Sequence, residues 1–324
     1  MTKLIAGFFV LLGFSVFAEM PYVAELPQFK ANNLTILWDA PTNQLGASLW
    51  VYKVTAQNFS ADAINYLLKI GGLTNTIKQS QALSVANSSN TCQLTVVPEL
   101  GYIRYWDGFA AANHWDKTNH LVEPVVGLPA TNEIQKLGLR LLKRFGIQPH
   151  DLAQRGDGRL ITFGEMKTRG YYDRRKKQFV EDEVITRGIF FSRRLNGINF
   201  LGIGSRAGCE IEFGNNAKVS EFTMVWRNYE PYQCFRIANT VEVIQQIHAG
   251  NAILTRKNLV NQSDVKSLTI TKVEPSYIGA SELEKQGFLY PLAKVEATAD
   301  FGTNRIGIEL YCPILSTNIY RGRR

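Results

Sequence analysis

The sequence predicts an α+β fold in which helices pack on antiparallel sheets, built from repeated units of a helix followed by a hairpin. Three segments carry apolar residues at helical spacing, and each is followed by segments in which apolar and polar residues alternate. These alternating segments come in consecutive groups and do not alternate singly with helices. A doubly wound parallel sheet is therefore not expected, and antiparallel sheets with helices on one face fit the order better.

The first elements are two strands and a helix. Alternation predicts strands at Leu34–Trp38 and Leu49–Val54. Ser60 is a typical N-cap residue, an apolar stripe follows it, and Gly71 and Gly72 end the predicted helix.

A hairpin follows, with strands at Cys92–Val96 and Tyr102–Trp106 joined by a Pro-Glu-Leu-Gly turn. Its plan is that of a later hairpin, because in both a cysteine opens the first strand and a tryptophan closes the second. The similarity hints at an internal repeat.

The later, central hairpin is the clearest strand pattern in the chain. Cys209–Phe213 alternates apolar residues with glutamates, and a Gly-Asn-Asn turn, which tolerates a left-handed backbone, follows it. On the returning strand the apolar positions are Phe222, Met224 and Trp226. Alternation predicts that these three side chains face the core and that the opposite face meets water.

The strongest helical pattern opens at Pro129 and Thr131 and ends at Gly146. Its apolar residues share one face, while its lysines and arginines lie elsewhere. That face consists of Ile134, Leu137, Leu141, Leu142 and Phe145. The next segment, 155–182, is polar and basic and is expected to be mobile.

The last third predicts one helix and three strands. The helix starts near Asn239 or Thr240 and ends at Gly250. The predicted strands are Leu268–Val273, Leu292–Thr298 and Ile306–Tyr311.

Residues 1–18 have the pattern of a secretory signal peptide. Lys3 precedes an apolar run, and Val16 and Ala18 supply the small residues of a cleavage site. The run is shorter than the ~20 residues of a membrane span, and no later segment is long and apolar enough to cross one. We therefore expect an exported protein, periplasmic or extracellular, with no membrane-spanning segment after cleavage.

Composition and charge limit the classes of partner. A chain of 324 residues with 45% hydrophobic and 20% charged residues is typical of a globular protein with a sizeable core. The formal net charge is +8, and basic residues gather at 167–177 and at the C-terminal tail. Contact with anionic envelope polymers or lipid head groups is one interpretation, but a solvated loop and a frayed end are favoured. Export argues against nucleic acid as a partner.

The cysteines and histidines predict no metal site and no cofactor. Cys92, Cys209, Cys234 and Cys312 form no CxxC pair, so the sequence indicates disulfides or buried thiols and leaves the 3 possible pairings open. His114 and His120 lie in one loop with Asp116, a spacing that could contribute to a metal site. Nothing completes a zinc set, and no HExxH motif is present.

Arg193-Arg194-Leu195-Asn196-Gly197-Ile198, then Gly202, an alternating strand and Trp226, resembles the PepSY-type module. Gly287-Phe288-Leu289-Tyr290-Pro291 and the strand after it are similar to the closing strands of tandem versions. The resemblance spans 131–313, and the basic segment 167–177 departs from it. It implies an inhibitory, chaperoning or regulatory role outside the cytoplasm through a protein partner, without catalysis and without catalytic residues.

The expected organisation has four parts. Residues 1–18 are the signal peptide, and 19–128 form an N-terminal α+β unit. The two remaining parts, 129–235 and 236–324, are the central and C-terminal PepSY-like units.

One loop is a candidate ligand-binding site for a glycan. Aromatic faces and carboxylates suit a pyranose ring, and the loop offers both types of side chain. The candidate residues are Trp106, Asp107, Phe109, Trp115 and Asp116. The favoured alternative is that these aromatic residues plug the end of a sheet.

Two further motifs favour structural interpretations. Glu181-Asp182-Glu183 is interpreted as a solvated run, since three consecutive carboxylates alternate faces and do not form a catalytic pair. The glycine-rich stretch Gly202–Gly208 is followed by a strand and not by a helix, so it is interpreted as a β-corner and not a phosphate loop. No GxSxG motif anchors Ser/His/Asp chemistry.

Three functional hypotheses follow. The first is an exported, non-enzymatic protein that acts through protein contacts. The second is an envelope protein that binds or cleaves glycan through the 106–116 loop, and the third is a purely structural secreted protein. Exposed edge strands with an apolar patch would favour the first, and a concave aromatic cleft with two facing carboxylates the second.

Overall fold

The structure is a computed structural model. It describes residues 28–31, 33–42, 45–74, 82–110, 115–116, 121–122, 125–173, 176–200, 207–254, 262–280, 282 and 284–315. The predicted signal peptide lies outside these ranges. Among the helices in these ranges, none combines the length and the apolar character needed to cross a membrane.

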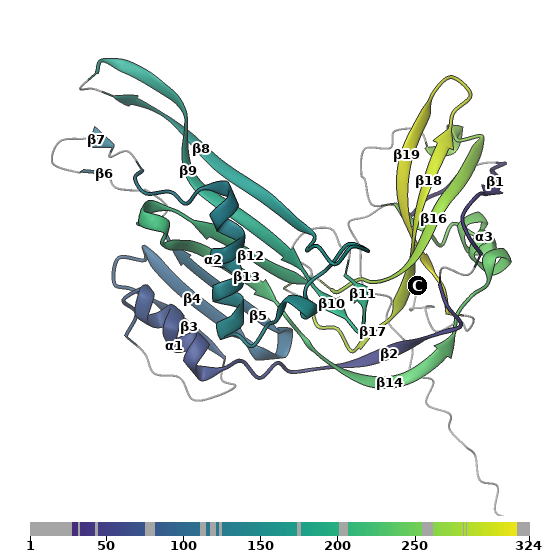
Figure 1. The fold of residues 1–324 in the computed structure, drawn as a ribbon, viewed down its shortest axis with the longest axis horizontal. Coiled ribbons are helices and arrows are strands. Elements are labelled where there is room, and N and C mark those ends of the chain that lie inside the picture. The colour runs from purple at the N-terminus through teal and green to yellow at the C-terminus, as the bar shows by residue number, and fades with distance from the viewer. Residues whose placement is uncertain are drawn as a thin grey trace, which may run out of the picture.

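Two β-rich lobes stand on either side of a small joining sheet (Figure 1). The first lobe contains a seven-stranded antiparallel sheet with the strand order β3-β4-β5-β13-β12-β9-β8. Its strands are β3 (Leu83–Ala86), β4 (Cys92–Val97), β5 (Tyr102–Asp107), β8 (Thr162–Asp173), β9 (Gln178–Ser192), β12 (Gly208–Phe213) and β13 (Val219–Val225).

The second lobe contains a five-stranded sheet with the order β1-β16-β18-β19-β15. Its strands are β1 (Thr35–Trp38), β15 (Ile253–Leu254), β16 (Ser267–Tyr277), β18 (Pro291–Asp300) and β19 (Arg305–Pro313). Helix α3 (Thr240–His248) packs against this lobe through Val243 and Ile247. Asn239 caps the helix as the sequence predicts, since its side chain accepts a hydrogen bond from the Glu242 amide at 3.0 Å.

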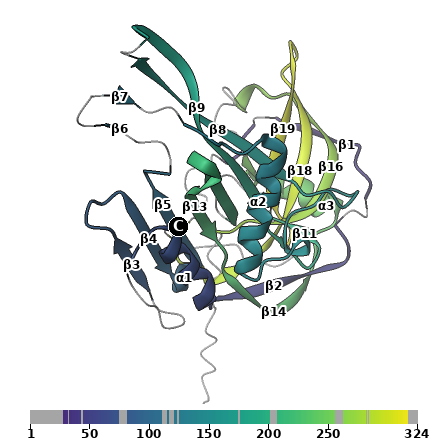
Figure 2. The ribbon, with the colours of Figure 1, turned by 60° about the vertical axis from the view of Figure 1, so that its left-hand side comes forward.

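The joining sheet has three strands in the order β14-β2-β17. Its long strands β2 (Ser48–Thr55) and β14 (Asn228–Arg236) run between the lobes, and the short β17 (Phe288–Leu289) lies beside β2 (Figures 1 and 2). Two small hairpins complete the described strands. They are β6–β7 (Trp115–Asp116 and Leu121–Val122) and β10–β11 (Arg194–Leu195 and Ile198–Asn199).

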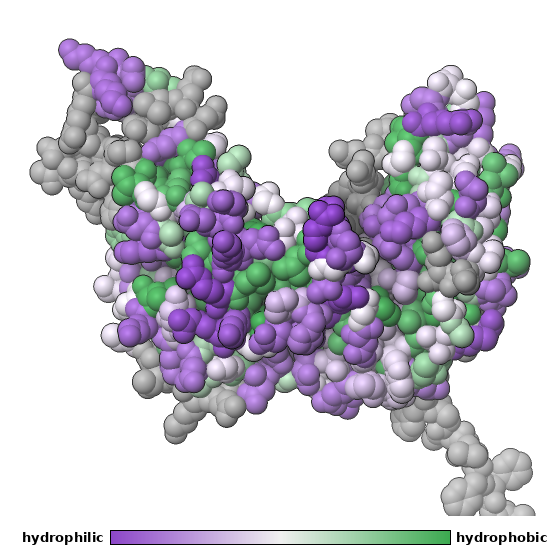
Figure 3. All heavy atoms as spheres, in the orientation of Figure 1, coloured by the Kyte–Doolittle hydropathy of each residue, from purple (hydrophilic) through white to green (hydrophobic). Residues whose placement is uncertain are grey.

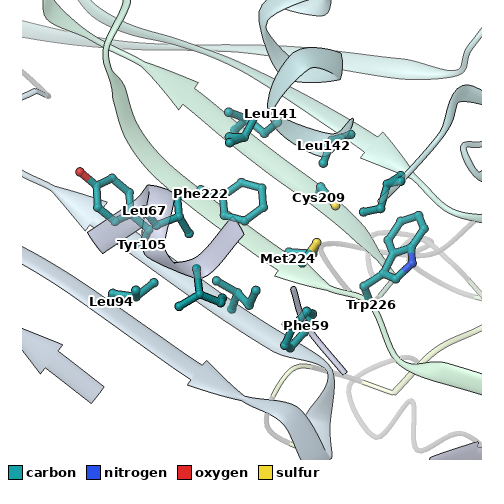
Figure 4. Close-up of a cluster of buried hydrophobic side chains, with 14 of the residues drawn as sticks. Phe59, Leu67, Leu94, Tyr105, Leu141, Leu142, Cys209, Phe222, Met224 and Trp226 are labelled. Atoms are coloured by element: carbon teal, nitrogen blue, oxygen red, sulfur yellow. The ribbon is translucent and has the colours of Figure 1, made fainter. Parts of the chain in front are cut away.

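The first core lies between the seven-stranded sheet and two helices, α1 (Ala61–Ile70) and α2 (Thr131–Arg144). Figure 4 shows Leu141 and Leu142 of α2 above strand β13, which carries Phe222 and Met224, with Trp226 just past the end of that strand. The last three side chains are 0%, 1% and 7% exposed, which confirms the predicted core face of the central hairpin. The helix approaches the sheet closely because position 138 is glycine: a Cβ there would lie 2.7 Å from the Phe191 ring.

The predicted fold class is wrong. Among the described residues there are nineteen strands and three α-helices, so the molecule is mainly β and is not a repeat of helix and hairpin. Strand pairing joins distant segments: Ile103 of β5 lies opposite Met224 of β13, and Thr35 of β1 lies opposite Ser267 of β16. The seven-stranded sheet thus takes strands from both sides of the expected boundary between 128 and 129. Helices are followed by strands along the chain as predicted, but the strands do not pair within each such unit.

The segment 155–182, expected to be mobile, forms most of a long hairpin. Its strands β8 and β9 pair antiparallel from Thr162 opposite Phe191 to Asp173 opposite Gln178. Its charged residues conceal the strand pattern in the sequence because they are satisfied across strands: Arg169 forms an ion pair with Glu183 at 2.9 Å. Cross-strand pairs of opposite charge stabilise a sheet.

The four cysteines are thiols and not disulfides. Cys92, Cys209 and Cys312 are buried, and Cys234 is exposed. Burial raises the pKa of the Cys209 and Cys312 thiols, so both are unreactive core residues.

Candidate interaction surface

The β8–β9 hairpin projects beyond the rest of the first lobe (Figures 1 and 2). Strand β8 has 12 residues and is the outermost strand of the seven-stranded sheet, with β9 as its neighbour. One side of β8 therefore presents backbone donors and acceptors that no named strand of the sheet uses. A long outer strand of this kind is a template for pairing with another chain.

Large apolar side chains are exposed along this hairpin. Phe163, Met166 and Tyr172 of β8 are 59%, 63% and 56% exposed, and Phe179 of β9 is 59% exposed. We refer to these four residues and the outer edge of β8 as the arm surface. Phe163 and Met166 are three positions apart on a regularly paired stretch of β8 and so lie on opposite faces of the hairpin, whereas Tyr172 lies directly opposite Phe179 nearer its tip. Large apolar side chains left exposed on a projecting hairpin are typical of interaction sites. The tip of the arm is hydrophilic (Figure 3) and includes Lys176 and Lys177.

Next to the arm surface, the sheet face opposite α1 and α2 carries a ladder of charges. Arg104 of β5 pairs with Glu221 of β13 at 3.4 Å, and Lys167 of β8 reaches Glu221 at 3.3 Å and also contacts Glu212 of β12. Glu212 is buried and accepts a hydrogen bond from the Thr186 hydroxyl at 3.1 Å. The ladder ties β5, β13, β12, β9 and β8 together on the side that no α-helix covers.

Next to the ladder, Glu165 of β8 and Glu210 of β12 join Glu212 in a cluster of three carboxylates. Oxygens of Glu165, Glu210 and Glu212 are all within 4.8 Å of one another. Burial, with the nearby charges of Glu165 and Glu212, raises the pKa of Glu210 to about 7. Lys167 supplies positive charge to the same group, and its pKa is raised because the carboxylates of Glu212 and Glu221 outweigh the opposite effect of its burial.

The raised pKa of Glu210 predicts that stability falls as pH rises from about 5 to 8. The folded state holds the Glu210 proton more tightly than the unfolded chain does, so this contribution is complete below the ordinary glutamate pKa of 4.5 and is lost above about 7. Glu210→Gln removes the titration. At pH 8 we expect the free energy of unfolding of the variant to exceed that of the wild type by roughly 1–2 kcal/mol after allowance for solvent screening, and its unfolding temperature to be higher. At pH 5 we expect the two proteins to be equally stable.

Thermal unfolding at the two pH values measures this effect. The control is Glu99→Gln, which changes an exposed carboxylate in the turn before β5. If Glu210→Gln and Glu99→Gln shift the midpoint equally at pH 8, the carboxylate cluster does not control stability.

Glu183 has a structural position that the sequence interpretation missed. The acidic run 181–183 was expected to be solvated, but the Glu183 side chain is 15% exposed. It pairs with Arg169 and accepts a hydrogen bond from the Val125 amide at 2.9 Å. Glu183 therefore ties the arm to the segment before α2. The side chains of Glu181 and Asp182 lie outside the described residues.

The predicted glycan loop is brought together only in part. The Asp107 side chain points toward the backbone of the following turn, where it accepts hydrogen bonds from the amides of Phe109 and Ala110 at 3.0 and 3.1 Å. The Trp106 ring covers this turn, since a Cβ at Gly108 would lie 3.0 Å from it. Phe109 is 45% exposed.

The remaining residues predicted for this loop cannot be placed beside these three. The side chains of Trp115 and Asp116 lie outside the described residues, as do His114 and His120. Among the described residues, no concave aromatic cleft with two facing carboxylates forms at this loop.

Sequence reasoning missed the arm surface. Its apolar residues are separated by charged and polar ones, so the segment has a low apolar content. A usable signal was present: Phe163, Tyr172 and Phe179 are large aromatic residues in a stretch with no helical period, which is typical of a strand.

Comparison with known proteins gives no family. No protein-family model and no curated protein matches the chain. Among solved structures, an uncharacterized protein from Eubacterium rectale is similar at 12% sequence identity and a TM-score of 0.45, over 90% of this chain and 92% of that chain.

Proposed function

We propose that this protein acts through contacts with a partner protein, and not by catalysis, and that the arm surface makes the contact. The observation that supports the proposal is the outer strand β8, which carries large exposed apolar side chains on a hairpin that projects from the lobe. Proteins that bind no partner at such a strand normally protect it by covering it, shortening it, bending it with bulges, or placing charged residues or prolines in it. Register shifts interrupt β8 near Lys167 and Arg169, but both of these side chains are held in ion pairs within the sheet. β8 has 12 residues and no proline.

The mode of contact that fits an outer strand is addition of a strand by the partner. An extended segment of the partner would pair with the outer edge of β8, and main-chain hydrogen bonds would supply affinity. The exposed rings of Phe163 and Tyr172 would select apolar side chains in that segment. Lys176 and Lys177 lie at the arm tip and directly follow Arg174 and Arg175 in the sequence, so a segment with acidic residues near one end is favoured.

The cellular compartment of the partner and the biological role of the contact are proposed from the sequence. The pattern of residues 1–18 supports export, so the partner is proposed to lie in the cell envelope or outside the cell. The resemblance around Arg193–Ile198 supports a regulatory or inhibitory role.

Site-specific photo-crosslinking tests the proposal. A photoreactive amino acid in place of Met166 is expected to give a covalent adduct with a partner protein in the native envelope. The matched control is the same amino acid in place of Val241, which is 60% exposed on α3 of the other lobe. We expect no adduct there, because the contact belongs to the arm.

A charged double variant gives the second readout. Phe163→Asp combined with Met166→Asp is expected to abolish capture of the same partner, because it places charge on the apolar contact. Val241→Asp is expected to leave capture unchanged. An adduct of twice the chain mass would identify a second copy of this protein as the partner. Equal adducts from both positions, or none from position 166, would contradict the arm as the contact.

A further inference from the structure

A cleft of about 630 Å³ opens beside the end of α2. Its walls come from the turn after α2, from the short helix Pro149–Asp151 and from the turn Arg193–Gly197, with Trp226 between them. The volume falls within the range of small-molecule sites, roughly 300–1,000 Å³. None of the lining residues belongs to the arm surface, so the contact proposed above does not account for the cleft.

The backbone holds Arg193 firmly at the cleft. Its amide donates to the Ala207 carbonyl at 3.2 Å, and its carbonyl accepts from the Phe200 amide at 2.7 Å. It also forms a β-bridge with Leu152, which follows the short helix in the cleft wall. These contacts fix where the side chain begins.

The Arg193 side chain is 8% exposed and lies among aromatic rings. Its guanidinium carbon is 4.5 Å from the ring centres of both Trp226 and Tyr229 and 5.8 Å from that of Phe200. One nitrogen, Nη1, donates to the carbonyl of Arg227, whereas Nε has no hydrogen-bond partner in the part of the chain that the structure describes. Aromatic faces attract a cation but do not neutralise its charge.

The charges around the cleft do not balance. No carboxylate among the described residues forms an ion pair with Arg193. Asp151, the carboxylate in the wall, contacts His150 Nε2 at 3.4 Å and accepts from the Gln148 amide at 2.8 Å. Burial lowers the pKa of the Arg193 guanidinium, and the nearby charge of Asp151 offsets this effect only in part.

A second guanidinium borders the same cleft. Arg194 donates from Nη1 to the side-chain oxygen of Gln154, and its Nε is also buried without a hydrogen-bond partner in the described residues. Two guanidinium groups thus line a cleft whose single carboxylate already has other contacts, and neither forms an ion pair with a carboxylate of the described residues. An anion would satisfy both the donors and the charge.

We propose that this cleft binds a small organic anion through the guanidinium of Arg193, with Arg194 as the second contact. The planar fork of a guanidinium matches the paired oxygens of a carboxylate or of a phosphate ester. The recognised chemistry is therefore an oxyanion on a molecule small enough to enter the cleft. The proposal stands independently of the arm surface.

Isothermal titration calorimetry on the full chain tests the site with benzoate, phenyl phosphate and the neutral analogue benzamide. We expect saturable binding of at least one anion at millimolar or lower concentration and none of benzamide. Which anion binds distinguishes carboxylate from phosphate recognition. Arg193→Met is expected to weaken binding about tenfold or more, because it removes the charged donors. The control Arg305→Met, whose wild-type side chain is 76% exposed in the other lobe, should bind as the wild type does.

Stability measurements separate a binding role of Arg193 from a structural one. Methionine removes a buried charge but also the hydrogen bond to the Arg227 carbonyl and the cation–π contacts, so these effects offset one another and the unliganded variant is expected to stay folded, with an unfolding temperature close to that of the wild type. If Arg193→Met does not fold, Arg194→Met serves in its place and is expected to weaken binding at least threefold. The proposal is overturned if neither anion binds the wild type saturably, if benzamide binds as well as the anions, or if the folded arginine variants bind as the wild type does.

Discussion

Replacing Phe222 with alanine is expected to lower the free energy of unfolding by roughly 3–5 kcal/mol, as large truncations in a core do. The Phe222 side chain is 0% exposed and lies at the centre of the first core (Figure 4). Its ring stacks on Phe145 at the end of α2, with 5.1 Å between the centroids and 25° between the planes. The substitution therefore removes contacts between the sheet and α2 and leaves a cavity that neither rigid element can close.

Chemical denaturation measures the loss for Phe222→Ala. The control is Val241→Ala, which shortens an apolar side chain that is 60% exposed and is expected to change stability by no more than about 0.5 kcal/mol. A loss for Phe222→Ala as small as that of the control would mean that the sheet and α2 do not pack as described.

Gly101→Ala is expected to destabilise the protein by about 2–5 kcal/mol, for two separable reasons. The residue has φ +60°, in the left-handed region that disfavours a Cβ. In addition, a Cβ at this position would lie 2.7 Å from the backbone N and Cα of Arg227. Gly101 also accepts a hydrogen bond from the Trp226 amide at 2.7 Å, so the two backbones cannot separate without breaking it.

Gly72→Ala isolates the second reason. Gly72 has the same φ of +60°, but nothing lies within 4 Å of its added Cβ. We expect it to cost only the conformational part, about 1–2 kcal/mol. Equal losses for the two alanine variants in thermal or chemical unfolding would show that the backbone at Gly101 can yield to the added methyl group.

The close approach at Gly101 also bears on the cleft. The Gly101 backbone packs against Trp226 and Arg227 and holds them in place. The Trp226 ring and the Arg227 carbonyl both contact the Arg193 guanidinium. Arg227 in turn donates to the carbonyls of Ala280 and Glu284 at 2.7 and 2.9 Å. The wall of the cleft is therefore connected, through hydrogen bonds of the Arg227 side chain, to the segment that precedes β17.

The positions of the helices and the buried faces of some strands could be predicted from the sequence, because they depend on residues close together in the chain. The helix after Ser60, the helix from Thr131 and the helix capped by Asn239 all form where apolar spacing and capping residues predict them. The burial of Phe222 and Met224 follows from alternation, since a strand has only two faces and one of them is apolar.

The candidate sites could not be predicted in the same way. The arm was concealed because charges such as those of Arg169 and Glu183 are satisfied across strands, so a polar sequence forms a regular hairpin. In the sequence, the motif that begins at Arg193 indicates only a resemblance to the PepSY-type module. Its relation to Trp226 and Asp151 arises only when three separate segments meet.

The sequence by itself therefore determined where the three helices and the strands with clear alternation form and which of their faces are apolar, but not the β8–β9 hairpin. The tertiary structure alone decided which strands pair, and so decided the fold class. Alternation is the same whatever the partner strand is, and the hydrogen bonds that join β1 to β16 or β5 to β13 connect residues far apart in the chain. The same reason holds for the cleft: the unused donors of Arg193 matter only because packing has surrounded them with rings and no carboxylate.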